Sequence, residues 1–336
     1  MTHPVLQIED LRVHYRRRRI NPFAAAQVVH AVDGVSLSLG KGRTLGLVGE
    51  SGCGKTSLAR AVLRLVPVTS GSISLAGRRV DSLHGAGLRE ARRGMQYIFQ
   101  DPYSSLNPRV RAGRIVQSPL DVLRIGDAPS REARVAELFA AVGLRPEQRA
   151  LFPHQFSGGQ RQRINIARAL APEPSLIVCD EPVSALDVAI RAQILNLLVR
   201  LQQERGIAYL FISHDMAVVK HMADDVAVMY LGQIVERAPS RAFFRAPLHP
   251  YSVALKSAVP SVRGAGATSN ARIRLAGDPP SPIDPPPGCR FAPRCPVAVG
   301  ECHQTLPALR EVAPGHAVRC HRVEAKGGRV VGPMPT

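Results

Sequence analysis

One stretch of eight residues, Gly49–Thr56, constrains this chain more than any other. Its sequence GESGCGKT fits the pattern G-x-x-x-x-G-K-[ST], in which glycines let the backbone turn tightly and point its N–H groups at phosphate oxygens. The apolar run Thr44–Val48 before it predicts a buried strand, and Ser57–Leu65 after it predicts a helix whose N-terminus favours negative charge. Strand, loop and helix in this order predict a site for nucleotide phosphates within an α/β domain.

The residue types within this loop predict separate roles. The Lys55 amine would reach the β- and γ-phosphates of a nucleotide, and the Thr56 hydroxyl would bind Mg²⁺. Cys53 lies inside the loop, and we expect its thiol, like that of Cys179, to act as a small packing group without chemistry. The other residues predicted to contact the phosphates are Gly49, Ser51, Gly52, Cys53, Gly54 and Ser57.

A second candidate phosphate contact begins at Ser157. Ser157 and two following glycines open a predicted helix, and such a helix start can hold an anion. The chain has only one phosphate-binding loop of the first kind, Gly49–Thr56, called the P-loop below, so this second helix start needs an explanation. The residues predicted to contact phosphate here are Ser157, Gly158, Gly159 and Gln160.

Two carboxylates follow the apolar run Leu176–Cys179, which predicts a buried parallel strand. Ligands bind at the carboxyl ends of the strands in a parallel sheet. Asp180 is therefore placed to hold Mg²⁺ through water, and Glu181 is placed to orient or deprotonate an attacking water molecule.

Together these motifs resemble the ATP-binding subunits of ABC transporters. The family's remaining motifs are matched by the Q-loop Phe99–Pro102, the signature Phe156–Gln160 (with Phe156 where Leu is commoner), the D-loop Ser184–Asp187 and the switch histidine His214. The resemblance implies that Gln100 touches Mg²⁺, that His214 senses the γ-phosphate and that Asp187 belongs to the nucleotide site. It also implies that two subunits sandwich two ATP molecules, each meeting the signature helix of the other subunit, which accounts for the helix start at Ser157.

The resemblance implies an α/β fold with a RecA-like parallel sheet, an antiparallel N-terminal β region and a helical subdomain at about 101–160. We expect residues 1–260 to form this ABC nucleotide-binding domain and residues 261–336 to form a separate, loop-rich Cys/Pro-rich module. Alternating residues in Leu6–Val13 and Val35–Leu39 predict strands, and Ser130–Val142 predicts a helix capped by Ser130.

In this family an aromatic residue at the end of the first strand stacks on adenine. Tyr15 is the first candidate and Phe23 the second. The alternative is that Tyr15 is a surface residue at a strand end.

The match narrows to the oligopeptide/dipeptide importer subfamily through Ile98–Arg109, Arg245–Ser252 and a cysteine-bearing tail. Of the two paired ATPases in such importers, Val13–Tyr15 and Ser184–Ile190 look more like the second. The resemblance implies ATP hydrolysis that drives import of peptides or related small solutes. The implied partners are a paralogous ATPase in a heterodimer, two transmembrane permease subunits and an extracytoplasmic solute-binding protein, which with the permease selects the solute.

The tail carries Cys289, Cys295, Cys302 and Cys320 within 32 residues. Disulfides are disfavoured in the cytoplasm, and no C-x₂₋₄-C pair of the kind that structural zinc prefers occurs. Four thiolates suit an iron–sulfur cluster, although their spacing matches neither ferredoxin pattern. Members of the resembled subfamily can carry a 4Fe–4S cluster on such a tail; zinc, unligated thiols and disulfides remain alternatives.

The formal net charge of +18 raises the alternative of a soluble ABC ATPase acting on nucleic acid or ribosomes. The basic residues are scattered apart from 16–19, and arginine predominates, so we give this alternative less weight. The intact Glu181 and signature argue against a non-catalytic regulatory subunit. Because no run approaches ~18 apolar residues and the N-terminus has no signal-peptide pattern, we expect a peripheral protein at the cytoplasmic face of the cell membrane.

Overall fold

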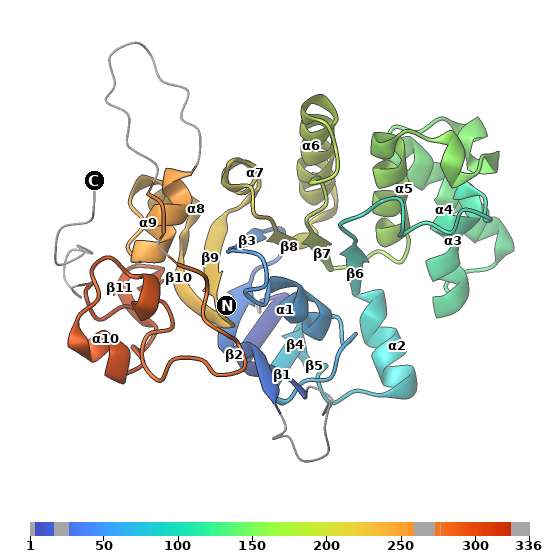
Figure 1. The fold of residues 1–336 in the computed structure, drawn as a ribbon. Coiled ribbons are helices and arrows are strands. Elements are labelled where there is room, and N and C mark those ends of the chain that lie inside the picture. The colour runs from blue at the N-terminus through green and yellow to red at the C-terminus, as the bar shows by residue number, and fades with distance from the viewer. Residues whose placement is uncertain (1–3, 17–26, 259–272, 276, 324–336) are drawn as a thin grey trace, which may run out of the picture.

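The computed structural model describes residues 4–16, 27–258, 273–275 and 277–323, which form two sheets covered by helices (Figure 1). The predicted α/β fold is therefore confirmed. Phe23 and the predicted domain boundary at 260 lie outside the described residues.

A four-stranded antiparallel sheet forms the N-terminal part of the fold. Its strands, in spatial order, are β2 (Val28–Leu39), β1 (Leu6–Arg16), β4 (Ser70–Leu75) and β5 (Arg78–Arg79). Both predicted strands are present, but β2 begins at Val28 instead of Val35. The first residues of β2 are only partly buried and do not alternate, so pairing with β1, not periodicity, extends the strand.

An eight-stranded sheet carries the predicted strands around the P-loop. Its order is β11 (Arg310–Ala313), β12 (His316–Val318), β10 (Gln233–Pro239), β9 (Asp225–Tyr230), β3 (Thr44–Val48), β8 (Ala208–Ile212), β7 (Leu176–Asp180) and β6 (Met95–Ile98). The five strands from β9 to β6 run parallel. Every residue of β3, β7 and β8 is buried, which explains why these strands read as continuous apolar runs.

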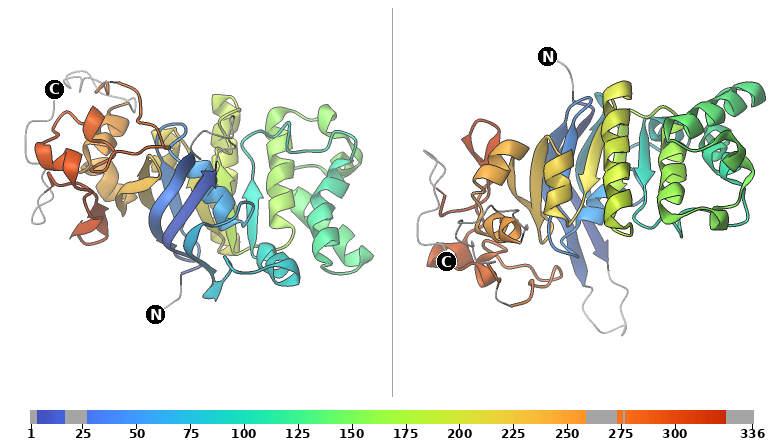
Figure 2. Two further views of the ribbon diagram at one scale, coloured as in Figure 1. Left: turned by 60° about the horizontal axis from the view of Figure 1, so that its bottom comes forward. Right: turned by 90° about the horizontal axis from the view of Figure 1, so that it is seen from above.

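Helices cover both sheets and form a separate group at one end of the larger sheet. The helices packed around the sheets are α1 (Lys55–Val62), α2 (Gly85–Arg93), α6 (Val188–Arg205), α7 (Met216–Met222), α8 (Ser240–Arg245) and α9 (Pro250–Ser257). The helical subdomain consists of α3 (Ala112–Leu123), α4 (Ala128–Ala141), α5 (Gly158–Leu170) and the short 3₁₀ turns Pro146–Ala150 and Pro153–Gln155. Figure 2 shows this green group at the end of the sheet opposite the orange and red C-terminal segments.

The start of α4 corrects one prediction. Asp127, not Ser130, is the N-cap, and its side chain accepts the Ser130 N–H at 3.0 Å. Ser130 completes a capping box, because its hydroxyl accepts the Asp127 N–H at 2.9 Å. Pro129 favours the earlier start, since proline is accommodated in the first helical turn.

The C-terminal segment departs from the prediction of a separate module. Besides the 3₁₀ turn Ala292–Arg294 and α10 (Gly300–Gln304), it contributes β11 and β12. β12 pairs antiparallel with β10, joining Val318 to Glu236 and Ala317 to Arg237. The tail is therefore not separate from the sheet, and its strands of three and four residues are too short for periodicity to reveal.

Candidate nucleotide site

A cavity of about 680 Å³ lies at the carboxyl ends of the parallel strands, around the P-loop. The predicted residues that line it are Tyr15, Ser51, Gly52, Cys53, Gly54, Lys55, Thr56, Ser57, Gln100, Glu181 and His214. Residues that sequence reasoning missed complete the wall: Val29, His30, Ala31, Leu231, Gly232 and Pro282. None of these six belongs to a local motif, so only the three-dimensional fold could bring them to the site.

Backbone carbonyls of the P-loop accept hydrogen bonds from the lysine of the same loop. Lys55 is buried, and its Nζ donates to the carbonyls of Gly49 at 2.8 Å and Glu50 at 2.9 Å. Gly54 adopts φ 111°, and a Cβ there would lie 2.0 Å from the Ala31 carbonyl oxygen, so only glycine fits. Cys53 is buried, and burial raises the pKa of its thiol, as expected for a packing residue.

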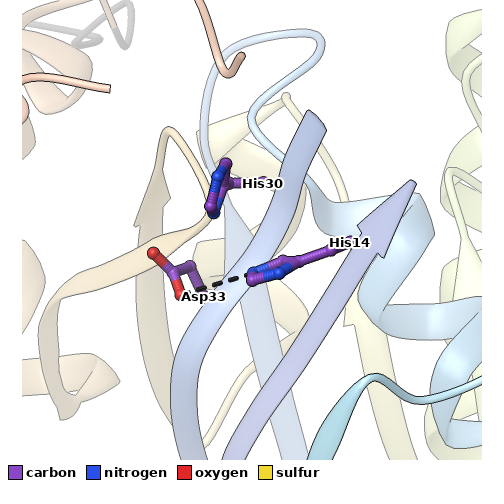
Figure 3. Close-up of side chains that lie close together, drawn as sticks. All are labelled: His14, His30 and Asp33. Atoms are coloured by element: carbon purple, nitrogen blue, oxygen red, sulfur yellow. Dashed lines mark ion pairs between the residues drawn. The ribbon is translucent and has the colours of Figure 1, made fainter. Parts of the chain in front are cut away.

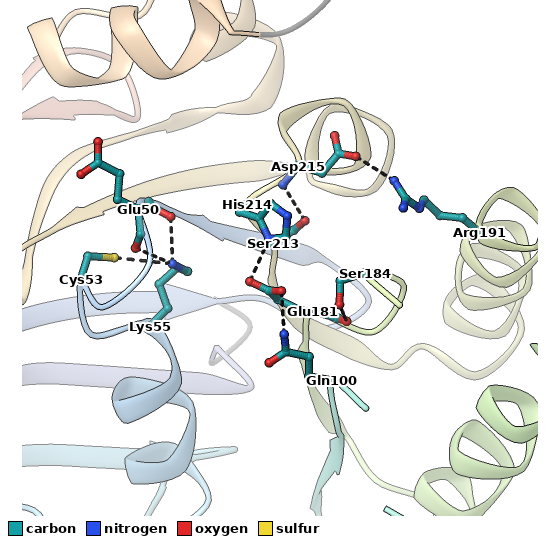
Figure 4. A network of polar contacts seen from close by, with 11 residues as sticks. Glu50, Cys53, Lys55, Gln100, Glu181, Ser184, Arg191, Ser213, His214 and Asp215 are labelled. Carbon is teal, nitrogen blue, oxygen red and sulfur yellow. Dashed lines mark hydrogen bonds and ion pairs between the residues drawn. The ribbon is translucent and has the colours of Figure 1, made fainter. Parts of the chain in front are cut away.

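Three polar side chains converge opposite the P-loop (Figure 4). Glu181 Oε2 accepts from Gln100 Nε2 at 3.1 Å, and Glu181 Oε1 lies 2.9 Å from His214 Nδ1. Glu181 directly follows β7 and adopts φ 48°, a left-handed conformation that is uncommon for a residue with a side chain. The carboxylate is thus held between a strand-end amide and an imidazole, facing the cavity.

Asp180, the last residue of β7, is buried beneath this group. Its Oδ2 accepts the Tyr97 hydroxyl of β6 at 2.6 Å. Burial raises the pKa of Tyr97, and the bond to Asp180 acts in the same direction, so the phenol stays protonated and can donate. Sequence reasoning missed Tyr97, because it lies 83 residues from Asp180 and belongs to no motif.

The predicted signature and D-loop residues do not line this cavity, nor do Gly49 and Asp180. Ser157 caps α5 and forms a capping box with Gln160, and Asp187 caps α6 by accepting the Ile190 N–H at 2.9 Å. A Cβ on Gly159 would lie 2.4 Å from Ile190 Cγ2, so this glycine lets α5 and α6 approach closely. Within one chain these residues therefore have structural roles away from the cavity.

His30, which lines the cavity, lies close to His14 and Asp33 (Figure 3). Their possible ligand atoms lie within 4.8 Å of one another, and His14 Nε2 is 3.5 Å from Asp33 Oδ1. Burial lowers the pKa of His30, and His14 lowers it too. Arg12 donates to Asp33 at 3.2 Å and Arg290 also binds this carboxylate, so two guanidinium groups already compensate its charge and disfavour a cation here.

The four tail cysteines are free thiols, and Cys302 lies next to Cys289, whose N–H donates to the Cys302 carbonyl at 2.7 Å. Cys289 and Cys295 pack against the cluster that contains Tyr251 of α9 and Val235 of β10. Burial raises the pKa of Cys295 to about 12, and the thiols of Cys320, Cys289 and Cys302 act in the same direction. Burial likewise raises the pKa of Cys320 to about 11, with smaller contributions from Cys289 and Cys302. Among these four described residues no three sulfurs lie within 4.8 Å of one another.

The fold and the cavity define an ATP-binding cassette ATPase. A family model described as ABC transporter matches residues 32–184. The solved ATP-binding cassette MJ0796, bound to ADP and Pi in a dimeric post-hydrolysis state, superposes with a TM-score of 0.62 at 26% identity, covering 70% of this chain and 99% of that one.

The comparisons also narrow the class. A second family model, described as oligopeptide/dipeptide transporter, C-terminal region, matches residues 235–302. Oligopeptide transport ATP-binding protein AppF of Bacillus subtilis is 47% identical over 94% of this chain and 97% of its own length. The protein named "Probable peptide ABC transporter ATP-binding protein y4tS", of Sinorhizobium fredii, is 49% identical over 96% of this chain and 90% of its own. The chain belongs to this family of peptide-type ABC transporter ATP-binding proteins.

In the part of the chain that the structure describes, no helix has the length and apolar character needed to cross a membrane.

Proposed function

We propose that this chain hydrolyses ATP to power the import of peptides or related small solutes through an ABC permease. The observation that carries the proposal is the convergence of Glu181, Gln100 and His214 across the cavity from the P-loop. The names of the relatives, which refer to peptide and oligopeptide transport, support the choice of cargo. This family relationship favours transport over the nucleic-acid alternative.

Four residues receive catalytic roles in this proposal. Glu181 orients and deprotonates the attacking water, because its carboxylate is an acceptor at the cavity wall. His214 senses the γ-phosphate next to Glu181, and Gln100 links this group to the helical subdomain that begins just after it. Lys55 contributes positive charge to the β- and γ-phosphates, where charge develops during hydrolysis. Tyr15, at the cavity wall, stacks on the adenine.

Mg²⁺ is the metal that this chemistry implies. Thr56 and Gln100, which line the cavity, would supply hydroxyl and amide oxygens, and the carboxylate of Asp180 beneath them would act through water, a donor set that suits this hard cation. When bound, Mg²⁺ neutralises charge on the β- and γ-phosphate oxygens. We expect EDTA to abolish hydrolysis and added Mg²⁺ to restore it.

A second subunit completes the site in this proposal. Ser157, Gly158, Gly159, Gln160 and Asp187 lie away from this chain's cavity and would meet the nucleotide of a facing subunit. The dimeric state of the MJ0796 cassette supports such a partner. We propose a paralogous ATPase in this position, beneath two permease subunits that receive solute from an extracytoplasmic binding protein. An active complex with two copies of this chain and no paralogue would overturn the heterodimer alone.

A 4Fe–4S cluster on the tail forms the remaining part of the proposal. The four thiols are mutually close, yet their sulfurs are spread more widely than the roughly 3.8 Å that tetrahedral zinc with Zn–S bonds of ~2.3 Å would impose. What supports the cluster is the donor set itself, because four thiols are the ligands that an iron–sulfur cluster requires. Ligation would keep all four thiols deprotonated despite the raised pKa values of Cys295 and Cys320.

Metal analysis of anaerobically purified protein tests this assignment. We expect about four irons per chain and broad absorbance near ~400 nm, both lost in Cys302→Ser while the ATPase core stays folded. Stoichiometric zinc without iron would replace the cluster by a zinc site. Finding neither iron nor zinc would rule out the cluster.

Transport itself is tested in cells from which the chromosomal gene for this protein has been deleted. Wild-type protein should restore uptake of a labelled peptide, and Glu181→Gln should not. Alkaline extraction should release the protein from the cytoplasmic face of the membrane, as for a peripheral subunit. Restored uptake with Glu181→Gln would contradict the proposed role of hydrolysis.

A further inference from the structure

The acidic residue of the P-loop is bound by an arginine of the C-terminal tail. Arg294 Nη1 lies 2.8 Å from Glu50 Oε2, and Arg294 Nη2 lies 3.3 Å from Glu50 Oε1. The Arg294 side chain is only 7% exposed, against 29% for Glu50. A bidentate pair of this kind fixes the orientation of the carboxylate as well as its position.

Glu50 in turn shapes the place where Lys55 lies. Its backbone N–H donates to the Tyr251 hydroxyl at 2.7 Å, and its carbonyl accepts from Lys55 Nζ at 2.9 Å. Side chain, amide and carbonyl of Glu50 are thus each held by a different partner. A shift of Arg294 would therefore move the carbonyl that Lys55 contacts.

A second tail arginine binds a residue that lines the cavity. Arg290 is buried, donates to the carbonyl of Leu231 and pairs with Asp33. Leu231 and Gly232 line the cavity, and the Gly232 N–H donates to the Cys53 carbonyl of the P-loop at 2.8 Å.

These two arginines are next to two of the proposed cluster ligands in the chain. Arg290 follows Cys289, and Arg294 precedes Cys295. The same segment begins with Pro282, which lines the cavity and accepts the His30 N–H at 2.9 Å. The tail therefore contacts the surroundings of the nucleotide cavity at several points, and two of its contact residues, Arg290 and Arg294, adjoin a cysteine in the chain.

We propose that Arg294 and Arg290 are positioning residues of the nucleotide site, and that they couple ATP binding to the state of the four-cysteine module. The coupling rests on the proposed function, since it requires ATP in the cavity. Because such coupling is reciprocal, a module that is intact favours ATP binding, and bound ATP favours an intact module by the same factor.

The first test compares ATP affinities of full-length variants with a fluorescent ATP analogue. We expect Arg294→Gln and Glu50→Gln each to weaken binding about tenfold, within the usual range of coupling between sites. The double variant should bind no worse than either single variant, because both remove the same interaction. Arg294→Lys should restore only part of the affinity, since a lysine cannot form the bidentate pair. Wild-type affinity in Arg294→Gln, or additive losses in the double variant, would overturn the proposal.

Arg319→Gln is the matched control. Arg319 also fastens the tail, by donating to the carbonyls of Ile234 at 3.1 Å and Pro307 at 2.9 Å, but it does not touch the P-loop. We expect this variant to lower thermal stability while ATP affinity stays at the wild-type value. An equal loss of affinity in Arg319→Gln and Arg294→Gln would show general loosening of the tail, against specific positioning.

The reciprocal test does not depend on hydrolysis. Iodoacetamide labelling of Cys295 is followed by mass spectrometry, with and without a non-hydrolysable ATP analogue. We expect the analogue to slow labelling several-fold in wild-type protein and not in Arg294→Gln. Equal labelling rates in a wild-type protein that binds the analogue would overturn the coupling, whereas failure of the wild-type protein to bind the analogue would overturn the proposed function.

Discussion

The parallel sheet and the C-terminal tail both reach the nucleotide cavity, but different interactions hold them there. Every residue of β3, β7 and β8 is buried, so apolar packing fixes the strand ends that carry the P-loop and Glu181. The tail reaches the cavity through Arg290, Arg294 and the Pro282 carbonyl. The strand ends that carry the P-loop and Glu181, here called the floor of the site, therefore depend on many weak contacts. The tail contacts made by Pro282, Arg290 and Arg294, here called its rim, are few, and single substitutions can remove the charged ones.

The largest expected effect tests the floor. Glu181→Gln keeps the shape of the side chain but cannot act as a base, so we expect turnover to fall about 10²- to 10⁴-fold. ATP affinity and the metal content of the tail should stay unchanged, because the floor is fixed independently of this carboxylate. Phosphate release, analogue binding and metal analysis measure the three quantities. Hydrolysis within a few-fold of the wild-type rate would contradict the role given to Glu181.

The next effect concerns His249, which caps α9 and whose ring centroid lies 5.6 Å from that of Phe291 in the tail. His249 is buried, and burial lowers its pKa to about 4, although the Glu236 carboxylate acts in the opposite direction. The unfolded chain, with a histidine pKa near 6.5, binds the proton more readily, so stability is complete above about pH 6.5 and falls as the pH drops toward 4. The loss should reach about 3 kcal/mol, measured by denaturant unfolding at a series of pH values.

His249→Asn is the control for this pH dependence. His249 Nδ1 accepts the Tyr251 N–H at 3.1 Å, and an asparagine oxygen can preserve this cap of α9. The variant should lose much of the slope between pH 6.5 and 4. An unchanged slope would assign the acid sensitivity to other groups.

A smaller effect is expected from Lys55→Ala. The substitution removes a positive charge from the β- and γ-phosphates, so ATP affinity should fall about 30-fold, or roughly 2 kcal/mol. Titration with a fluorescent analogue measures it. Because the Glu50 carbonyl also loses a donor, a matching change in Cys295 labelling would link floor and rim, while unchanged nucleotide affinity would count against the P-loop assignment.

The smallest effect separates packing from chemistry. Tyr97→Phe leaves the buried Asp180 without the hydroxyl that donates at 2.6 Å, and we expect it to lower the free energy of unfolding by about 1.5 kcal/mol. Hydrolysis should change only a few-fold, because Tyr97 does not line the cavity. A hundredfold loss of turnover would instead place Tyr97 in the chemistry.

The floor could be predicted from sequence because each of its motifs is local. Each motif includes an apolar run that predicts a strand together with the residues at its carboxyl end. These runs are Thr44–Val48 before Gly49–Thr56 and Leu176–Cys179 before Asp180 and Glu181. A parallel sheet then brings those ends to one edge without further information. Even the cap at Ser157 follows from a Ser and a Gln three residues apart.

The rim could not be predicted in this way. Arg294 and Glu50 are 244 residues apart, and neither residue type nor spacing indicates that they meet. The same holds for Arg290 with Asp33 and for Tyr97 with Asp180. Contacts of this kind follow only from the complete fold. Sequence patterns therefore identified the cysteines of the tail but could not predict how the tail contacts the rest of the protein.

The pairing of β12 with β10 has a consequence for how this protein avoids self-association. An uncovered outer strand offers a row of free N–H and carbonyl groups that can recruit a strand from another molecule. By lying along β10 at Glu236 and Arg237, β12 occupies part of that row with the chain's own residues. A chain cut after α9 would expose β10 to intermolecular strand addition, and its first symptom would be aggregation during synthesis, before any nucleotide is bound.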